Sequence, residues 1–379
     1  WEKKMAAKKI SRRKILQKSG LVAAAGLLSA CNNGGTPDKP SDSAKILKKK
    51  IEWKMVTTWP KNFPGLGTGA QRIADNITAM SDGRLTIKLF AAGELVPAFE
   101  CFDAVRENKA QMFHANAYYW INKNKSMPFF GAVPGGFTAQ EHNAWIYYAG
   151  GQQLWDKLYA QFNLKPFMGG NSGTQMGGWF LNEVNSVSDF KGLKMRIPGL
   201  AAEVLNRMGG TAVLLPGGEI MPSLQSGAID ATEWVGPWND LAFGFHKITK
   251  FYYGPGFHEP SSALECVINL DAYNALDNDL KSIIKNASEA ENTKMLSEFT
   301  AANIDAQQKL VNDHGVIIRN FPKDVFNLMM SLSKEVVAET ASEGKINKDI
   351  YESWNKFKEN AIKRSPFNEH GYSNLSNNT

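Results

Sequence analysis

Hydrophobic and polar positions near the start of the folded part of the chain change from the period of a strand to that of a helix and back. Residues 51–59 ("IEWKMVTTW") are rich in β-branched and aromatic side chains, as strands are. Residues 69–81 then place Ile73 and Ile77 four positions apart, which is the spacing of one helix face. Residues 83–90 ("GRLTIKLF") return to alternation. This segment therefore predicts a strand, a helix and a second strand.

The same succession of elements continues along most of the chain. A helix over 97–108 and a short strand over 110–116 come next. A second series follows residue 166, with strands within 177–182, 192–198 and 211–216 and helices over 201–209 and 219–227. Strands that alternate with helices predict an α/β fold with parallel or mixed sheets, and two such units predict two lobes with a cleft between them.

The end of the chain has a different pattern, which sets the domain boundaries. Residues 277–364 have an almost continuous helical pattern with charged faces, interrupted by one short strand over 315–321. We therefore expect a first lobe at residues 51–165 together with about 245–285, and a second lobe at residues 166–244. A helical region at residues 286–379 is expected to pack on both lobes.

Residues 1–30 predict an export signal. The stretch "SRRKIL" is basic, and the apolar run that follows it is too short to span a bilayer. The adjacent Arg12 and Arg13 resemble a twin-arginine signal. The run ends in "LSAC", which resembles the site at which bacterial lipoproteins are cleaved and lipidated, so we expect lipidation at Cys31. The alternative is that Cys31 ends an ordinary signal peptide.

Residues 31–50 predict a flexible tether. The stretch "NNGGTPDKPSDSAK" is polar and rich in Gly, Pro and Ser, and it has no apolar side chains to pack. No later segment reaches about 18 uninterrupted apolar residues, the length needed to span a membrane. We therefore expect a periplasmic body that is held to a membrane surface by a lipid anchor.

The charge distribution argues against nucleic-acid binding. The whole chain has a net charge of +6, but residues 1–18 contain eight Lys or Arg and only one acid. The remaining residues therefore carry a net charge of −1, and the basic character belongs to the leader. A nearly neutral body lacks the positive surface that phosphate backbones require.

The usual motifs of catalysis and cofactor binding are missing from the sequence. Residues 65–70 ("GLGTGA") open a helix after a strand, but they have the spacing GxGxG instead of the dinucleotide fingerprint GxGxxG. There is no GxSxG, HExxH or CxxC, and the six histidines show no metal-ligand spacing. We therefore expect no enzymatic activity. Cys101 and Cys266 could pair or remain as buried thiols.

Four polar residues lie in apolar or glycine-rich surroundings at predicted loops or strand ends. They are Gln175 in "GNSGTQMGGWF", Arg196 in "LKMRIPG", Glu233 in "DATEWVGPWND" and Glu259 in "GPGFHEPSSA". An arginine suits a carboxylate, and glutamine and glutamate oxygens suit sodium or calcium. Taken singly, each residue could equally be a surface residue or part of a structural ion pair.

Several longer segments resemble the substrate-binding proteins of tripartite ATP-independent periplasmic (TRAP) transporters, and within that family the branch that binds 2-oxo and related 2-hydroxy acids. The similarity extends from about residue 50 to about residue 365. The segments that carry it are "AGELVPAFECFDAVREN", "GNSGTQMGGWFLNEVNSVSDFKGLKMRIPG", "LPGGEIMPSLQSGAIDATEWVGPWNDLAF" and "YYGPGFHEPSSALECVIN". The resemblance implies a two-lobed periplasmic binding protein fold, with hinge strands and a long helix joining the lobes.

The resemblance also implies roles for individual residues. Arg196 matches the arginine that grips the substrate carboxylate in this family. In the 2-oxo acid branch a cation lies beneath the substrate, and its oxygen ligands match the side chains of Gln175, Glu233 and Glu259 and the backbone carbonyl of Trp234. All these positions carry the residue type that the pattern requires. The implied cofactor is one calcium or sodium ion that bridges to the substrate.

Weaker candidates complete the wall of the site. Asn171, Tyr118, Tyr119 and Trp59 lie near family motifs, but packing in the core is the competing explanation for the aromatic residues. Trp238 is expected to exclude water beside Trp234.

The other acids and the net charge complete the expectations for the site. Asp230 and Asp240 are assigned to capping or surface roles. One arginine, two glutamates and a monocarboxylate sum to −2, which calcium would neutralise fully and sodium in part. Burial therefore favours calcium.

The implied mechanism is capture without chemistry. A small carboxylate between the arginine and the cation favours a closed state, which a TRAP permease in the membrane recognises. An exported oxidoreductase with a bound cofactor and a surface lipoprotein without a ligand are the alternatives. The helical tail could support a homodimer, as it does in relatives.

Overall fold

The computed structural model describes residues 50–376 of the chain. The predicted export signal with Arg12 and Arg13, the lipidation site Cys31 and the tether up to residue 49 lie outside the described residues. Within the described part, no helix is both long enough and apolar enough to cross a membrane.

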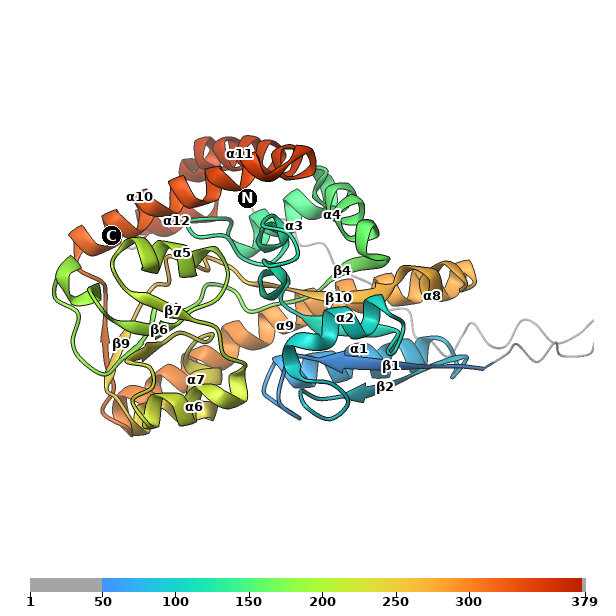
Figure 1. Cartoon of the computed structure of the whole chain (residues 1–379), viewed down its shortest axis with the longest axis horizontal. Helices are drawn as coiled ribbons and strands as arrows, with labels where there is room; N and C mark the ends of the chain where they lie inside the picture. Colours follow the sequence, from blue (N-terminus) through green and yellow to red (C-terminus); the bar gives the residue numbers. More distant parts are fainter. Residues whose placement is uncertain (1–49, 377–379) are drawn as a thin grey trace, which may run out of the picture. The chain divides into compact units, whose positions relative to one another are not determined.

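The first sheet has five strands in the order β2-β1-β3-β10-β4 (Figure 1). Strands β1, β2 and β3 are parallel to each other, and β10 runs antiparallel to both β3 and β4. The bounds are Ile51–Thr57 for β1, Leu85–Phe90 for β2, Met112–Ala115 for β3, Leu164–Asn171 for β4 and Ala263–Asn269 for β10. The strands predicted at 51–59, 83–90 and 110–116 are confirmed.

Both faces of this sheet are covered, and this explains the apolar strands. Side chains alternate between the two faces of a strand, so Met55 of β1 packs in one core cluster while the next residue, Val56, packs in another. Likewise, Met112 of β3 packs in the same cluster as Met55, and the next residue, Phe113, packs in the same cluster as Val56. Helices α1 (Leu66–Met80) and α9 (Asn278–Asn312) belong to the first of these faces, and α2 (Cys101–Arg106) and α4 (Gly151–Tyr159) to the second.

The second sheet has six short strands in the order β11-β9-β5-β8-β6-β7. They are β5 (Gly178–Phe180), β6 (Lys194–Arg196), β7 (Thr211–Val213), β8 (Ala231–Thr232), β9 (Phe251–Tyr253) and β11 (Ile317–Arg319). The helices between them and after them are α5 (Leu200–Arg207), α6 (Gly217–Gln225), α7 (Pro237–Phe243) and α10 (Lys323–Glu339). Strands and helices therefore occur where the second series of patterns predicts them, which confirms the two-lobed α/β fold.

Two chain segments cross from one sheet to the other and are hydrogen-bonded to each other. Residues 172–177 lead from β4 to β5, and residues 254–262 lead from β9 to β10. The Ser172 N–H donates to the Ser262 carbonyl at 3.0 Å, and the Gly177 N–H donates to the Tyr253 carbonyl at 2.7 Å. The pair forms a two-stranded connection between the sheets.

The sheets divide the chain differently from the predicted lobe boundaries. Strand β4 lies in the first sheet, although the predicted second lobe begins at residue 166. Strand β9 lies in the second sheet, although residues from about 245 were assigned to the first lobe. The physical reason is that the crossing segments are paired with each other by backbone hydrogen bonds, which the composition of a segment does not reveal.

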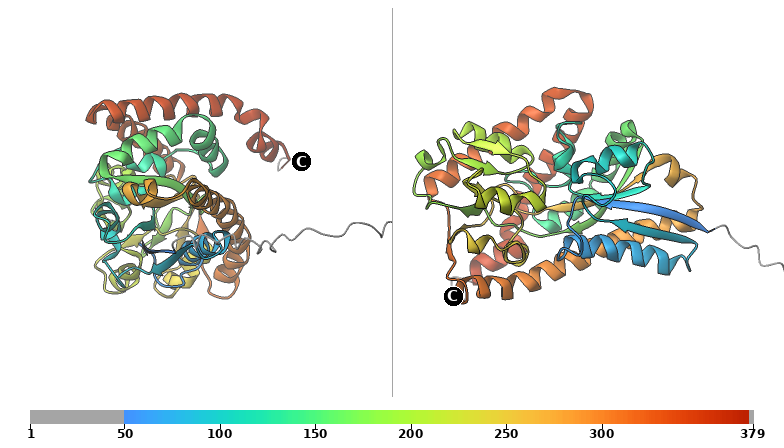
Figure 2. Two further views of the ribbon diagram at one scale, coloured as in Figure 1. Left: turned by 90° about the vertical axis from the view of Figure 1, so that its right-hand side faces the viewer. Right: turned by 60° about the horizontal axis from the view of Figure 1, so that its bottom comes forward.

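Helices from the end of the chain connect to both sheets. Helix α9 contacts α1 beside the first sheet and α7 beside the second, and Figures 1 and 2 show it passing along both. Helix α10 packs on α5, whereas α11 (Lys345–Arg364) packs on α4. The remaining helices are α3 (Ala139–Tyr148), α8 (Leu270–Asn274) and α12 (Glu369–Ser376). The predicted helical region therefore begins earlier than residue 286, with α9.

The two cysteines of the described part are both free and buried. Cys101 packs in the core cluster on one face of the first sheet, and Cys266 packs in the cluster on the other face. The sheet lies between them, so a disulfide is not formed. Burial raises the pKa of each thiol to about 12, and this makes both unreactive.

A buried carboxyl group on β10 makes the stability of the fold depend on pH. Glu265 is fully buried and accepts hydrogen bonds from Trp120 Nε1 at 2.5 Å and from the Tyr159 hydroxyl at 2.6 Å. Burial raises the pKa of Glu265 to about 7, and the two hydrogen bonds lower it only in part. An unfolded glutamate ionises near about pH 4.3. The folded state therefore keeps a proton that the unfolded state releases between these two values.

We expect the Glu265 contribution to stability to be complete below about pH 4.3 and to disappear as the pH rises through about 7. The free energy of unfolding of the wild type relative to Glu265→Gln should fall by on the order of 2 kcal/mol between pH 5 and 8. Urea unfolding at a series of pH values measures this difference. A difference that stays constant across the series would contradict the assignment.

Candidate functional site

The paired crossing segments bring Gln175 and Glu259 together. The Gln175 N–H donates to the Glu259 carbonyl at 3.0 Å, and the Gly256 N–H donates to the Gln175 carbonyl at 2.8 Å. Both side chains are buried, with 3% and 2% of each residue exposed. Two of the residues predicted to bind a cation therefore lie side by side between the sheets.

The second sheet supplies Arg196 and Glu233 from neighbouring strands. Arg196 is the last residue of β6 and is paired with Thr232, the last residue of β8, so Glu233 follows at the same edge of the sheet. Arg196 Nη1 forms an ion pair with the Glu233 carboxylate and also donates to its backbone carbonyl at 3.2 Å. The guanidinium lies 5.1 Å from the Trp234 ring, a cation–π contact.

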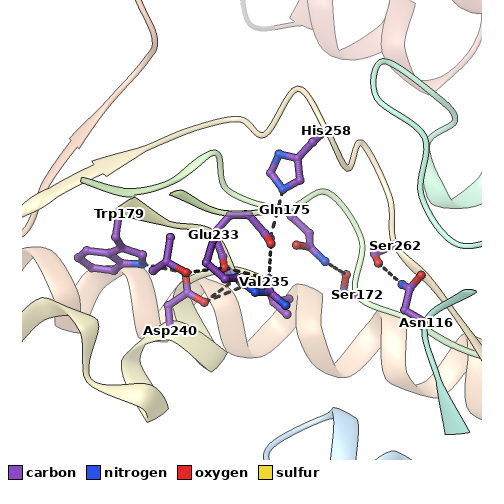
Figure 3. A network of polar contacts seen from close by, with 12 residues as sticks. Asn116, Ser172, Gln175, Trp179, Glu233, Val235, Asp240, His258 and Ser262 are labelled. Carbon is purple, nitrogen blue, oxygen red and sulfur yellow. Dashed lines mark hydrogen bonds and ion pairs between the residues drawn. The ribbon is translucent and has the colours of Figure 1, made fainter. Parts of the chain in front are cut away.

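A fourth titratable group, His258, completes the cluster and was not predicted from the sequence. Its Nε2 lies 3.3 Å from the Glu233 carboxylate (Figure 3). One ligand atom each of Glu233, His258 and Glu259 lie within 4.8 Å of one another. His258 was not singled out from the sequence, because the histidines show no metal-ligand spacing along the chain. The position of His258 directly before Glu259 is the signal that could have identified it.

The charges of this cluster perturb one another. Burial and, second to it, the negative charge of Glu233 raise the pKa of Glu259 to about 7. Burial alone lowers the pKa of His258, but the hydrogen bond and the charge of Glu233 outweigh this effect and raise it. Burial likewise lowers the pKa of Arg196, and the Glu233 carboxylate again outweighs it. A second positive charge beside the glutamates would relieve their repulsion.

Several buried polar atoms in the cluster have no hydrogen-bond partner within residues 50–376. Among them are Gln175 Oε1, Arg196 Nη2 and Glu259 Oε2. The Gln175 amide is held by its Nε2, which donates to Ser172 Oγ at 3.0 Å and leaves the oxygen free (Figure 3). An unpaired buried polar group costs about 1–3 kcal/mol, and a charged one costs more. Such a concentration of unpaired groups is typical of a ligand site.

Aromatic side chains line a small cavity next to these groups. The cavity has a volume of about 10 Å³, and its lining includes Trp59, Tyr118, Tyr119, Gln175 and Trp234. The Trp59 ring lies 6.2 Å from the rings of both Tyr119 and Trp234. The aromatic candidates therefore pack in the core and line the cavity at the same time, so the two explanations of these residues are compatible.

Two of the expected wall residues are not among those that line this cavity. Asn171 ends β4 and is fully buried; its Oδ1 accepts from the Gly173 N–H at 2.8 Å, and it is not among the residues that line the cavity. Trp238 packs against Phe299 of α9 with ring centroids 5.2 Å apart. It belongs to the contact between α7 and α9 instead of the cavity wall.

Asp240 has a different role from the surface or capping role that was predicted. It is 1% exposed and accepts hydrogen bonds from Trp179 Nε1 and the Val235 N–H (Figure 3). The Tyr252 hydroxyl and the Gly236 N–H also donate to it. Burial raises its pKa to about 6 despite these bonds. Asp240 therefore holds the chain that directly follows Glu233 and Trp234.

The contacts of Asp230 agree with the local structural role that was predicted for it. It is partly buried, and its carboxylate accepts the Lys194 N–H at 2.9 Å. This bond fixes the start of β6, the strand that ends at Arg196.

The donor set fits a hard cation. Two carboxylates and an amide oxygen are the ligands that calcium and sodium prefer, and the absence of thiolates in the cluster makes it unsuited to soft metals. The unpaired Arg196 nitrogen suits a carboxylate. The described arrangement can therefore hold a small anion and a cation together.

Comparisons with known proteins agree with this arrangement. Residues 55–343 match the DctP family, described as bacterial extracellular solute-binding protein, family 7. The monocarboxylate 2-oxoacid-binding periplasmic protein of Nostoc sp. is 38% identical over 366 residues, which cover 97% of this chain and 99% of that protein.

Solved structures show the same fold. A TRAP periplasmic solute-binding protein from Pseudoalteromonas atlantica, with bound sodium and pyruvate, is 39% identical with a TM-score of 0.83 and covers 86% of this chain and 99% of its own. One from Colwellia psychrerythraea, with bound calcium and pyruvate, is 40% identical with a TM-score of 0.82 and covers 86% of this chain and 100% of its own. The family resemblance inferred from the sequence is confirmed. The chain belongs to the DctP family and is an extracytoplasmic solute-binding protein of the TRAP transporter type.

Proposed function

We propose that this protein binds a small 2-oxo or 2-hydroxy monocarboxylate together with one calcium or sodium ion, without catalysing a reaction. Arg196 holds the carboxylate. The side chains of Gln175, Glu233 and Glu259 and the backbone carbonyl of Trp234 hold the cation. Trp59 and Tyr118 line the site, and Asn171 supports it from the end of β4.

The observation that carries this proposal is the set of unpaired buried atoms. Gln175 Oε1 and Glu259 Oε2 are acceptors and Arg196 Nη2 is a charged donor, all buried and all in one cluster. A cation satisfies the acceptors, and an anion satisfies the donor. Neither ligand alone satisfies both, which supports binding of the pair.

The relatives support the chemical class of the ligand. Two solute-binding proteins of about 40% identity hold pyruvate, one with sodium and one with calcium. The two buried glutamates favour calcium in this chain, because a divalent ion together with Arg196 balances them and one monocarboxylate.

Ligand binding is coupled to the approach of the two sheets. Asn239 of α7 donates to the Pro64 carbonyl of the first lobe at 3.0 Å, and Phe63 packs on Phe243 with ring centroids 4.4 Å apart. A ligand that contacts both lobes and the crossing segments stabilises this arrangement relative to an open one. The membrane subunits of a TRAP permease would then receive the closed form.

Thermal unfolding of the protein, refolded to remove carried-over ligand, tests the proposal. We expect pyruvate at about 100 times its dissociation constant to raise the free energy of unfolding by about 2.7 kcal/mol when calcium or sodium is present, and by much less in chelator without sodium. Dicarboxylates serve as the comparison ligands. If neither 2-oxo nor 2-hydroxy monocarboxylates stabilise the protein with any cation, the proposal is wrong.

Two further properties are proposed for the ends of the chain. Lipidation at Cys31 would hold the body at a membrane near its permease, and mass spectrometry of the native protein detects the added acyl mass.

A homodimer through the C-terminal helices would cover large apolar side chains that are 59–81% exposed, namely Ile362, Phe367, Tyr372 and Leu375. Sedimentation velocity should give a dimer for the wild type and a monomer for Tyr372→Ser/Leu375→Ser.

A further inference from the structure

His114 is a buried histidine of the first lobe that no ligand-binding role explains. It lies on β3, is fully buried, and pairs with Thr57 of β1 on one side and with Cys266 of β10 on the other. Burial lowers its pKa to about 4, so the imidazole is neutral at physiological pH. A neutral imidazole has one N–H donor and one acceptor nitrogen.

Both ring nitrogens of His114 have a partner, and together these partners define the tautomer. Trp59 Nε1, which can only donate, lies 2.8 Å from His114 Nδ1. The Gly169 carbonyl, which can only accept, lies 3.0 Å from His114 Nε2. The proton of the imidazole is therefore on Nε2, and the histidine links the Trp59 indole to the backbone of β4.

A β-bulge makes the Gly169 carbonyl available for this link. Leu264 of β10 pairs with Gly170 and Glu265 pairs with Met168, so Gly169 is an extra residue on β4 without a partner in β10. A side chain at this position would not fit, because a Cβ on Gly169 would lie 2.9 Å from the Cys266 Cβ. The bulge is therefore matched to glycine and presents its carbonyl to His114.

The indole that His114 holds forms a wall of the ligand cavity. Trp59 is 2% exposed and lines the cavity together with the apolar residues Leu66, Leu264, Val235 and Trp234. The lining also includes the polar residues Ser172, Gln175 and Ser262. A ligand whose carboxylate and 2-oxo group are held by polar residues would place the rest of its carbon chain against the apolar part of the lining, which includes the Trp59 ring.

We infer that His114 is a positioning residue that sets ligand length: by fixing the Trp59 indole in the wall of the cavity, it restricts the site to 2-oxo acids with very short side chains. This inference rests on the proposed binding of a 2-oxo monocarboxylate. The Trp59 ring can move away only if its N–H gives up the acceptor on His114, and a buried indole N–H without a partner is unfavourable. The hydrogen bond to His114 therefore holds the Trp59 indole in one orientation beside the cavity.

The test compares the dissociation constants of pyruvate and of 4-methyl-2-oxopentanoate by calorimetry at saturating calcium. One added methylene in a rigid apolar pocket changes affinity by about 10- to 200-fold, so the wild type should prefer pyruvate by at least about 100-fold. His114→Leu, which lacks the acceptor, and Trp59→Leu, which removes the wall, should each lower this ratio by at least about 10-fold.

Two controls separate positioning from a general loss of stability. His114→Gln keeps an amide donor and acceptor and should restore a ratio close to that of the wild type. Trp53 is a second buried tryptophan; it lies on β1 and packs on the opposite face of the sheet, so Trp53→Leu should lower the melting temperature without changing the ratio. If His114→Leu does not fold, Trp59→Phe, which keeps a ring but lacks the N–H, should show the lowered ratio.

The outcomes distinguish this inference from the proposed function. If pyruvate does not bind the wild type with any cation, the proposed function itself fails. If pyruvate binds, but the wild type does not prefer it or the ratio is unchanged in the folded His114→Leu or Trp59→Phe variant, only the role of His114 is overturned.

Discussion

Replacing Arg196 with methionine is expected to weaken pyruvate binding at least about 30-fold, because the loss of one partner of a buried charge pair costs about 2–5 kcal/mol. Arg196 is fully buried, and its Nη2 has no partner within the described part of the chain. The substitution removes that donor and also leaves the Glu233 carboxylate without its ion-pair partner. Calorimetric titration with pyruvate at saturating calcium, well below the melting temperature, measures the effect.

Two variants control this experiment. Arg207 of α5 is also paired with glutamates, but at the surface, and Arg207→Met should leave pyruvate affinity unchanged. Arg196→Lys keeps the charge but loses the planar fork, so its affinity should lie between those of the wild type and Arg196→Met. If Arg196→Met folds and binds pyruvate within threefold of the wild type, Arg196 does not hold the carboxylate.

Replacing Glu259 with glutamine is expected to abolish the binding of pyruvate that calcium supports. The substitution keeps the shape of the side chain but removes one of the two negative charges beside the proposed cation. For the wild type, pyruvate at about 100 times its dissociation constant should add about 2.7 kcal/mol to the free energy of unfolding in calcium, and for Glu259→Gln this increment should fall close to zero under the same conditions.

The free Glu259→Gln protein should nevertheless be at least as stable as the free wild type. The substitution removes a like charge next to Glu233, and Glu259 Oε2 has no hydrogen-bond partner among residues 50–376 that would be lost. Glu265→Gln is the matched control, because Glu265 is another buried glutamate but bonds only within the first lobe, to Trp120 and Tyr159. A Glu259→Gln protein with the wild-type response to calcium would place the cation elsewhere.

Much of the fold could be predicted because the relevant signals are local. The β-branched and aromatic side chains of β1 and the spacing of Ile73 and Ile77 in α1 reflect which side chains face a core, and both elements are found where the sequence predicts them. The lobe boundaries were less accurate. The glycine-rich stretch 169–173 begins within β4 and continues into the crossing segment, so no local signal marks the residue at which the chain leaves the first sheet.

The candidate site was predicted in part, and its missing members show what local patterns do not contain. Gln175, Arg196, Glu233 and Glu259 were named from their surroundings and from the family resemblance, and the structure places all four in one buried cluster. His258 was missed because its spacing from the other members along the chain is irregular. Asp240 was misassigned because its partners come from other strands and from the start of α7.

The sequence by itself determined the α/β class, the order of the elements, the family and the chemical types available for a site, since each of these depends on residue identity and short spacing. Only the tertiary structure decided which polar groups meet. Gln175 contacts Glu259 because two crossing segments pair, and Arg196 contacts Glu233 because β6 and β8 are neighbours. Strand pairing between distant segments depends on the packing of the whole core, so only the folded chain places an unpaired donor beside unpaired acceptors.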